Sequence, residues 1–178
     1  KSNFKIKKIS LTLKELEINQ IKKISSLIKP SNSKIFLNNK IKEGKVNTKV
    51  EFFLSDQGFF QNFIAKGKIT DLKVEFNNNL KFSRANLNFF ADKNDVLIQN
   101  IQGDLQEIKI SNGDIKLNLE NGLKLESNFN SKANLSEKQF GKYADFFYKY
   151  NSLVGLKSLK TDLNNNIFIK FDNTYKVK

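Results

Sequence analysis

Four residue types are absent from this chain of 178 residues. It contains no Cys, His, Trp or Met, and Pro30 is its one proline. Without Cys and His the chain has no disulfide, no thiol nucleophile, no imidazole base and no zinc site of the usual kind. The side chains left for catalysis are carboxylates and Lys.

Long apolar runs are missing as well. No stretch approaches the roughly 18 to 20 apolar residues that span a bilayer, and the N-terminus lacks the features of a signal peptide. The chain has no Met, and it begins and ends on Lys in polar, strand-like text. We therefore expect it to be an excised segment of a longer protein, so that any anchor or export signal lies outside it.

The formal net charge is +13, which raises nucleic acid or an anionic membrane surface as a partner. All but one of the 31 basic residues are Lys, however, and Arg84 is the exception. Proteins that read nucleic acids rely on Arg for bidentate contacts and stacking, which Lys does not reproduce. We therefore regard nucleic acid as an unlikely partner.

Short alternating apolar patterns fill most of the sequence, and residues 45–130 predict a β-meander. Asn-Gly pairs and other polar clusters punctuate them at intervals of about ten residues, which indicates antiparallel hairpins rather than parallel strands with crossover helices. The expected turns are "SDQG" 55–58, "NNN" 77–79, "DKND" 92–95, "NG" 112–113, "NG" 121–122 and "NNN" 164–166.

Two segments have helical periodicity instead. Residues 19–29 predict a helix that ends near Pro30, although a capping box of Thr12 and Glu15 offers an earlier start. Residues 136–150 predict a second amphipathic helix, with Ser136 as N-cap and Gln139 closing a capping box. Residues 4–18 are expected to be extended, with a bulge near Lys7 and Lys8. Closing strands are expected at about 157–175.

Several carboxylate pairs invite a catalytic or calcium-binding interpretation. They are Glu15 with Glu17, Asp92 with Asp95, Asp104 with Glu107, and Glu120 with Glu126. Glycoside hydrolysis needs two carboxylates that face each other across a cleft, and an EF-hand needs a longer, Gly-centred loop. Because these residues fall in turns or on the polar side of alternating strands, we expect no enzyme, no metal site and no cofactor.

Two helices are too few to cover the predicted sheet. About ten strands of six residues form a surface about 48 Å long, and the two helices cover about four strands. The remaining apolar surface can fold into a sandwich, close into a barrel or line an open trough for an apolar ligand. Base rates favour the sandwich.

A pattern of an extended segment, a glycine and a second extended segment repeats along the chain. With this pattern, the sequence resembles the AsmA-like family of bacterial envelope proteins, most closely its YhdP-type branch. The segments that carry the resemblance are 38–60, 65–122 and "LSEKQFGKYADFF" 135–147, and the pattern recurs at Gly44, Gly67, Gly103 and Gly113. The resemblance covers most of the chain, but it consists of degenerate alternations. The chain itself lacks the great length and the N-terminal membrane anchor of that family.

The resemblance implies a curved, open, taco-like β-groove whose apolar concave face carries phospholipid acyl chains between inner and outer membranes. The parent protein would then be periplasmic and anchored in the inner membrane by a segment outside this chain. Alternatives are a basic binding module for nucleic acid or an anionic surface, and a purely structural β-domain. The residues expected to face lipid are Leu72, Val74, Phe76, Leu87, Phe89, Ile108, Ile110, Ile115, Leu117, Leu119, Leu123 and Leu125.

Overall fold

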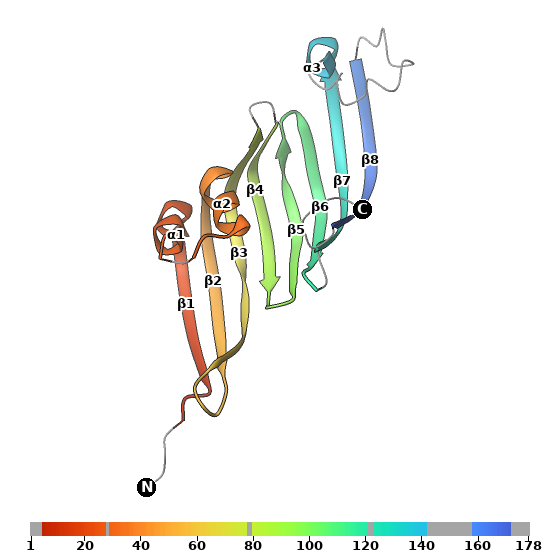
Figure 1. The fold of residues 1–178 in the computed structure, drawn as a ribbon. Helices are drawn as coiled ribbons and strands as arrows, with labels where there is room; N and C mark the ends of the chain where they lie inside the picture. The colour runs from red at the N-terminus through yellow and green to blue at the C-terminus, as the bar shows by residue number, and fades with distance from the viewer. Residues whose placement is uncertain (1–4, 28, 78–79, 121–122, 142–157, 172–178) are drawn as a thin grey trace.

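One open antiparallel sheet makes up most of the described residues. The structure is a computed structural model, and it describes residues 5–27, 29–77, 80–120, 123–141 and 158–171. Eight strands lie side by side in chain order, each hydrogen-bonded to the next, and β1 and β8 form the two edges (Figure 1). The predicted class, a mainly β antiparallel meander that stays open, is confirmed.

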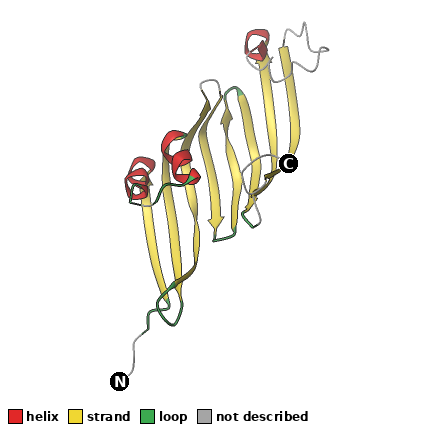
Figure 2. Ribbon diagram, viewed as in Figure 1, coloured by secondary structure: helices red, strands yellow, loops and turns green. Residues whose placement is uncertain are grey.

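In the part of the chain that the structure describes, three short helices accompany the strands. In Figure 2, α1 and α2 lie beside one end of the first strands, and α3 lies at the same end of the last two. The strands are β1 (Lys8–Glu17), β2 (Ile41–Leu54), β3 (Phe60–Asn77), β4 (Leu80–Ala91), β5 (Asp95–Leu105), β6 (Ile108–Asn118), β7 (Leu123–Ser136) and β8 (Ser158–Phe171). The helices are α1 (Ile18–Ser25), α2 (Asn32–Asn39) and α3 (Glu137–Gly141).

The strands are fewer and longer than the sequence suggested. They contain between 10 and 18 residues, whereas about ten strands of about six residues were expected. The meander also reaches beyond 45–130, because β2 begins at Ile41 and β7 ends at Ser136. Interruptions of the alternation that resemble strand ends are bulges within continuous strands.

The Asn112-Gly113 pair shows this error most clearly. A two-residue type I′ hairpin needs positive φ at both central residues, but only Asn112 has it, with φ at 50°. The pair lies inside β6 as a bulge opposite β7, so the predicted turn is wrong. The predicted turn at 164–166 is wrong too, since these residues pair with Asn128–Asn130 inside β8.

Two other predicted turns are confirmed. In 55–58, the Ser55 hydroxyl accepts hydrogen bonds from the backbone N–H groups of Gln57 and Phe59. In 92–95, the carboxylate of Asp92 accepts from the N–H groups of Asn94 and Asp95, both at 2.8 Å. The remaining predictions, 77–79 and 121–122, fall partly or wholly outside the described residues.

The N-terminal helix is shorter than predicted, and a second helix follows it. Helix α1 spans Ile18–Ser25 rather than 19–29. Its start is set by Glu17, whose N–H donates to Oε1 of Gln20 at 3.0 Å, and Thr12 lies in β1, so the rival start is wrong. Helix α2 was not predicted. Its N-cap is Ser31, whose hydroxyl accepts from the N–H of Lys34.

The predictions for the two ends of the chain are partly wrong. The bulge expected near Lys7 and Lys8 lies at Glu15 instead, where the register between β1 and β2 shifts. Helix α3 begins after Ser136, whose N–H donates to Oε1 of Gln139 at 2.9 Å as predicted. The rest of the expected helix, 142–150, lies outside the described residues. In the described part of 157–175, a single strand, Ser158–Phe171, replaces the expected closing strands.

The core is thin, as it must be in a single-layer sheet. Among the described residues, no large side chain is buried below 2% exposure. The main buried cluster consists of Leu72, Val74, Ala85, Leu87 and Ile101, from strands β3, β4 and β5. A smaller cluster of Ala133 and Leu135 lies in β7. The sheet therefore buries its apolar face in places and leaves it open elsewhere.

Candidate functional site

The candidate site is the apolar face of the sheet. Directly opposite residues in an antiparallel ladder project from the same face, so the register connects side chains across strands. One such row crosses all eight strands with apolar residues alone. It contains Leu11, Val50, Ala65, Ala91, Val96, Leu117, Leu125 and Ile169. The apolar face is therefore continuous from edge to edge.

Bulges preserve this face over the full length of the strands. Five strands contain one interior non-Gly residue with φ between 50° and 55°, where the register with a neighbour shifts. Each extra residue moves the alternation by one position, so that Ile69 and Leu72, three residues apart, join the same apolar cluster. Bulges also bend and twist a sheet. The five residues are Glu15, Asp71, Arg84, Asn100 and Asn112.

Polar side chains on neighbouring strands satisfy part of the backbone at two bulges. The N–H of Glu15 donates to Oδ1 of Asn47 at 3.1 Å, and the N–H of Asn100 donates to Oδ1 of Asp114 at 3.2 Å. Bulges leave backbone groups outside the regular ladder, and a nearby acceptor offsets that loss. Asn47 and Asp114 thus help to stabilise two of the bulges.

Glycines inside the strands allow close packing on this face. A Cβ at Gly103 would lie 2.8 Å from the ring of Phe82, and one at Gly113 would lie 2.8 Å from Cβ of Ile101. Real Cβ atoms do not tolerate such distances, so these positions require glycine. At Gly103 and Gly113, the repeated glycine pattern thus marks places where a side chain of a neighbouring strand lies over the backbone.

The helical end of the sheet is covered. Ile18, at the start of α1, is 3% exposed. Its Cγ1 lies over Gly44, next to the position that a Cβ on residue 44 would occupy. The backbone of Leu72 and the side chain of Ile69 also lie next to that position. The apolar face is therefore shielded at the α1 end of β2 and β3.

The middle of the face is open. A shallow hollow of about 560 Å³ is lined by residues that include Leu13, Thr48, Gly67 and Phe89, which lie opposite one another in β1 to β4. Gly67 contributes no side chain, which allows the backbone of Asn47 and Thr48 to approach it closely. Volumes of this size are common for ligand sites. Lys14, Lys49 and Lys66 also contribute to the lining. Each is next in sequence to a residue of the apolar face, so their side chains project toward the opposite face.

The twelve residues predicted to face lipid follow the alternation of this face, but their exposure differs. Leu72, Val74 and Leu87 are 6–8% exposed and belong to the main core, so they are packed against protein in this structure. Phe76 and Leu119, at strand ends, are exposed. The other seven are half-buried: Phe89, Ile108, Ile110, Ile115, Leu117, Leu123 and Leu125. Contact with lipid stays a prediction for all twelve.

The prediction omitted the edge strands. Ile9, Leu11, Leu163 and Ile167 are between 41% and 50% exposed, which makes them among the most open large apolar side chains of the sheet. Their alternation was visible in the sequence. What the sequence did not reveal is that β1 and β8 are edges, and therefore that their side chains have neighbours on one side only.

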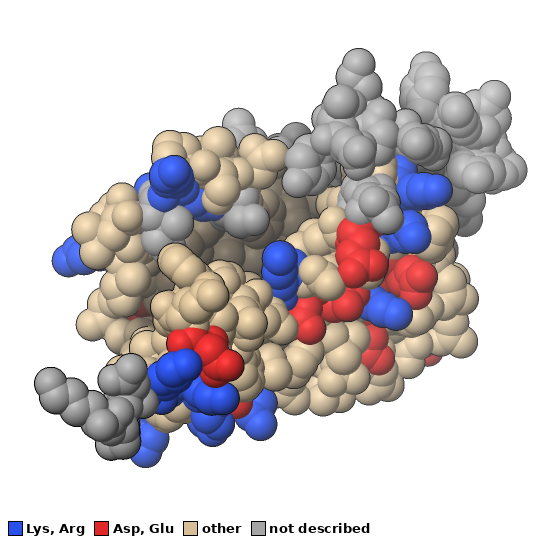
Figure 3. Space-filling model, turned by 60° about the horizontal axis from the view of Figure 1, so that its bottom comes forward, with Lys and Arg blue, Asp and Glu red and all other residues tan. Residues whose placement is uncertain are grey.

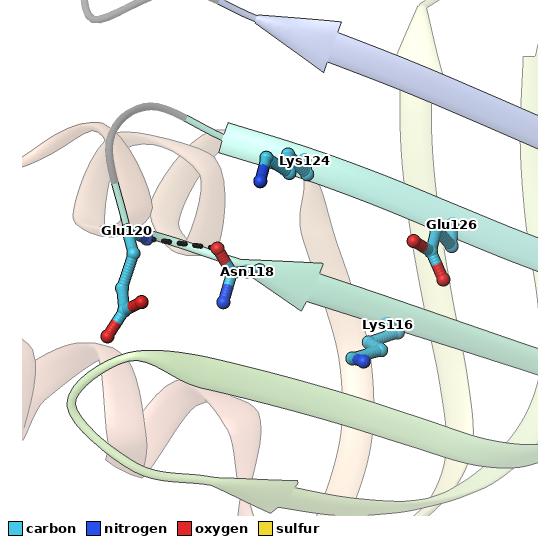
Figure 4. A pocket seen from close by; sticks show the side chains of 5 residues that line it. All are labelled: Lys116, Asn118, Glu120, Lys124 and Glu126. Carbon is cyan, nitrogen blue, oxygen red and sulfur yellow. Dashed lines mark hydrogen bonds between the residues drawn. The ribbon is translucent and has the colours of Figure 1, made fainter.

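The opposite face is polar where β6 and β7 cross it. Figure 4 shows Lys116, Asn118, Glu120, Lys124 and Glu126 around a shallow pocket of about 270 Å³. The N–H of Glu120 donates to Oδ1 of Asn118 at 3.3 Å, and Glu120 also accepts from Nδ2 of Asn94. These side chains alternate with Leu117, Leu119, Leu123 and Leu125, as predicted for the water-facing side.

Acidic and basic side chains are interspersed rather than segregated. In the view of Figure 3 they lie next to one another, and a hollow is visible on the left of the molecule. The pKa of Glu51 is lowered, first by the hydrogen bond from Lys49 and then by that from Lys8. The pKa of Glu75 is lowered mainly by Lys81. Part of the excess positive charge is therefore locally balanced.

The same pairing occurs at the bulge of β4. Arg84 Nε donates to Oδ2 of Asp104 on β5 at 2.7 Å, and this bond raises the pKa of the guanidinium. A similar bond to Glu43 raises the pKa of Lys73. Among the described residues, no cluster of three or more acidic side chains with metal-binding geometry is present. The carboxylates have structural partners in these places.

Comparison with protein-family models, with curated proteins and with solved structures finds no match to this chain. In the part of the chain that the structure describes, none of the helices has the length and apolar character needed to cross a membrane.

Proposed function

We propose that this chain is a segment of a lipid-transfer protein whose apolar concave β-face carries phospholipid acyl chains between inner and outer membranes. The observation that carries the proposal is an apolar face that runs across all eight strands of a sheet that, among the described residues, is neither closed nor covered by a second layer. Exposed apolar surface of this extent is rarely left without a partner in a soluble protein.

Burial of acyl chains would remove that surface from water. Contact with hydrocarbon stabilises by about 25 cal/mol for each Å² of apolar surface buried. The contacts are non-directional, so a chain can move along the trough without breaking a specific bond. The phosphate of the head group would stay in water at the open edge of the trough, where Lys side chains could meet it. This mechanism needs no catalytic group.

The setting of the parent protein is part of the same proposal. It would lie in the periplasm, anchored to the inner membrane by a segment outside this chain. A short trough cannot bridge two membranes, so neighbouring segments would have to continue the apolar face. The family resemblance and the open apolar face support this placement.

The test is the amount of phospholipid that co-purifies with the chain, measured by mass spectrometry of the extracted lipids. Leu117→Asp places a carboxylate in the middle of the apolar face, next to Val96 and Leu125. We expect it to reduce bound phospholipid by about tenfold or more, because a desolvated charge disfavours an apolar contact.

Leu97→Asp is the matched control. Leu97 is also half-buried, but it lies opposite Lys116 on the other face of the sheet. The same substitution there should leave lipid binding unchanged. Circular dichroism and urea unfolding of both variants establish that they fold. If the unsubstituted chain yields no phospholipid, or if both variants lose bound phospholipid equally, the proposal is wrong.

The alternative of a nucleic-acid partner is tested separately, by measuring how DNA binding depends on salt. Binding through Lys would weaken steeply with salt, so it should be strongest at about 50 mM salt. We expect no binding of duplex or single-stranded DNA there. Binding that is abolished by salt and unaffected by Leu117→Asp would favour the alternative of a basic binding module.

A further inference from the structure

The free edge of β8 differs from the edges that proteins usually expose. In the described part of the chain, β8 pairs with β7 alone, in one unbroken register from Leu123 opposite Phe171 to Ser136 opposite Ser158. Exposed edges are normally protected by shortness, bulges, Pro or Lys-rich sequence. The edge strand β1 is bulged at Glu15. Strand β8 has 14 residues, no bulge and no Pro.

Exposed apolar side chains accompany this unprotected backbone. Leu163 is 50% exposed and Ile167 is 41% exposed on the apolar face, and Phe168 is 64% exposed on the opposite face. A long, flat edge strand with exposed apolar residues is a template for a further strand. Both the backbone and the side chains of β8 therefore indicate a missing neighbour.

The sequence of β8 is complementary to itself. When two copies are placed antiparallel about Asn166, Asp162 of each lies opposite Lys170 of the other, and Leu163 lies opposite Ile169. Opposite charges and apolar pairs at directly opposed positions both stabilise a ladder. Moving the axis to Asn165 would place Lys160 opposite Lys170, which is unfavourable.

We propose that two copies of this chain pair through β8, antiparallel and centred on Asn166. Because odd-numbered residues lie opposite odd-numbered residues in this register, the apolar faces of both copies end up on the same side. The two eight-stranded sheets then form one sheet with one continuous apolar face. The interface is isologous and closes on itself, so it produces a dimer and not a filament.

The absence of Cys from the sequence makes a direct test of the register possible. Asn166→Cys puts two thiols opposite each other across the axis, with Cα atoms about 4.5–5.5 Å apart, which suits a disulfide. Asn164→Cys is the matched control, because it is equally exposed on the same face, but its two copies lie about 13 Å apart along the strands. We expect mild oxidation to give a covalent dimer with Asn166→Cys alone.

Charge exchange tests the interface without a crosslink. By analytical ultracentrifugation, Asp162→Lys and Lys170→Asp should each weaken the dimer by about tenfold or more, and the double variant should restore it. Lys14→Asp, on the opposite edge strand β1, should have no effect. A chain that sediments as a monomer at all concentrations overturns the proposal. So do assemblies larger than a dimer, and so does equal crosslinking of both Cys variants.

Discussion

The first six strands and the last two differ in how regularly they pair and in where they bury apolar side chains. Strands β1 and β3 to β6 each contain a bulge, whereas β7 and β8 pair over 14 residues without a register shift. The main core of Leu72, Val74, Ala85, Leu87 and Ile101 lies entirely in β3 to β5. At the other edge, Leu163 and Ile167 remain 50% and 41% exposed.

The difference indicates that curvature provides burial in a single-layer sheet. A bulge bends the strand that contains it, and bending crowds the side chains of the concave face against one another. The regular β7–β8 ribbon buries Ala133 and Leu135 near α3 but leaves Leu163 and Ile167 of its edge strand open to solvent. The bulged strands β3 to β5 thus hold the main core, while the edge strand β8 leaves apolar surface available for a partner.

The largest expected effect comes from emptying the core of the bulged region. Leu72→Ala removes a side chain that is 6% exposed, and we expect the free energy of unfolding to fall by about 2–4 kcal/mol. Leu163→Ala makes the same truncation at 50% exposure in β8 and should cost less than about 1 kcal/mol. Urea unfolding measures both. Equal losses would show that β8 is as well covered as β3.

A smaller loss is expected where the strands approach each other most closely. Gly113→Ala would place a Cβ 2.8 Å from Cβ of Ile101, so the backbone must shift, at a cost of about 1–3 kcal/mol. Ser111→Ala, at an exposed position of the same strand, should change the stability by less than about 0.5 kcal/mol. Thermal unfolding compares the two. A neutral Gly113→Ala would contradict close packing at the bulge.

Two Asn→Gly substitutions should have opposite signs. Asn112 has φ at 50°, a conformation that glycine adopts without strain, so Asn112→Gly should stabilise by about 0.5 kcal/mol. Asn164 lies in the regular ladder of β8, where glycine costs chain entropy, so Asn164→Gly should destabilise by about 0.5–1 kcal/mol. Denaturant midpoints give the signs, and a loss of stability in both variants would argue against the bulge at Asn112.

The smallest effect concerns acid stability, which should depend on β2 and β3. The pKa values of Glu51 and Glu75 are lowered from 4.5 in the folded state by Lys partners. A lowered folded pKa contributes stability above pH 4.5, and that contribution is lost as the pH falls through the folded value. Glu51→Gln with Glu75→Gln should therefore flatten the decline of the melting temperature between about pH 5 and pH 3. An unchanged decline would place the acid sensitivity elsewhere.

Much of the fold was accessible from local patterns. Alternation identified the antiparallel meander, and the Ser55 and Asp92 turns were found from their polar side chains. The capping interaction of Gln139 with Ser136 was predicted as well. Helix α2 was missed, because its short pattern of Ile35, Phe36 and Leu37 does not have a clear period. The alternation also predicted the face of Leu117 and Leu125 correctly, but not how deeply Leu72 and Leu87 are buried.

The sequence by itself determined that one face of each strand is apolar and that successive strands run antiparallel. Only the tertiary structure decided where each strand ends. Asn112-Gly113 and Asn164–Asn166 are locally compatible with a turn, a bulge or a continuous strand, since Asn adopts positive φ more readily than most residues and also the extended conformation. The choice depends on the neighbouring strands, which gain a full ladder of hydrogen bonds and a continuous apolar face when the chain does not turn.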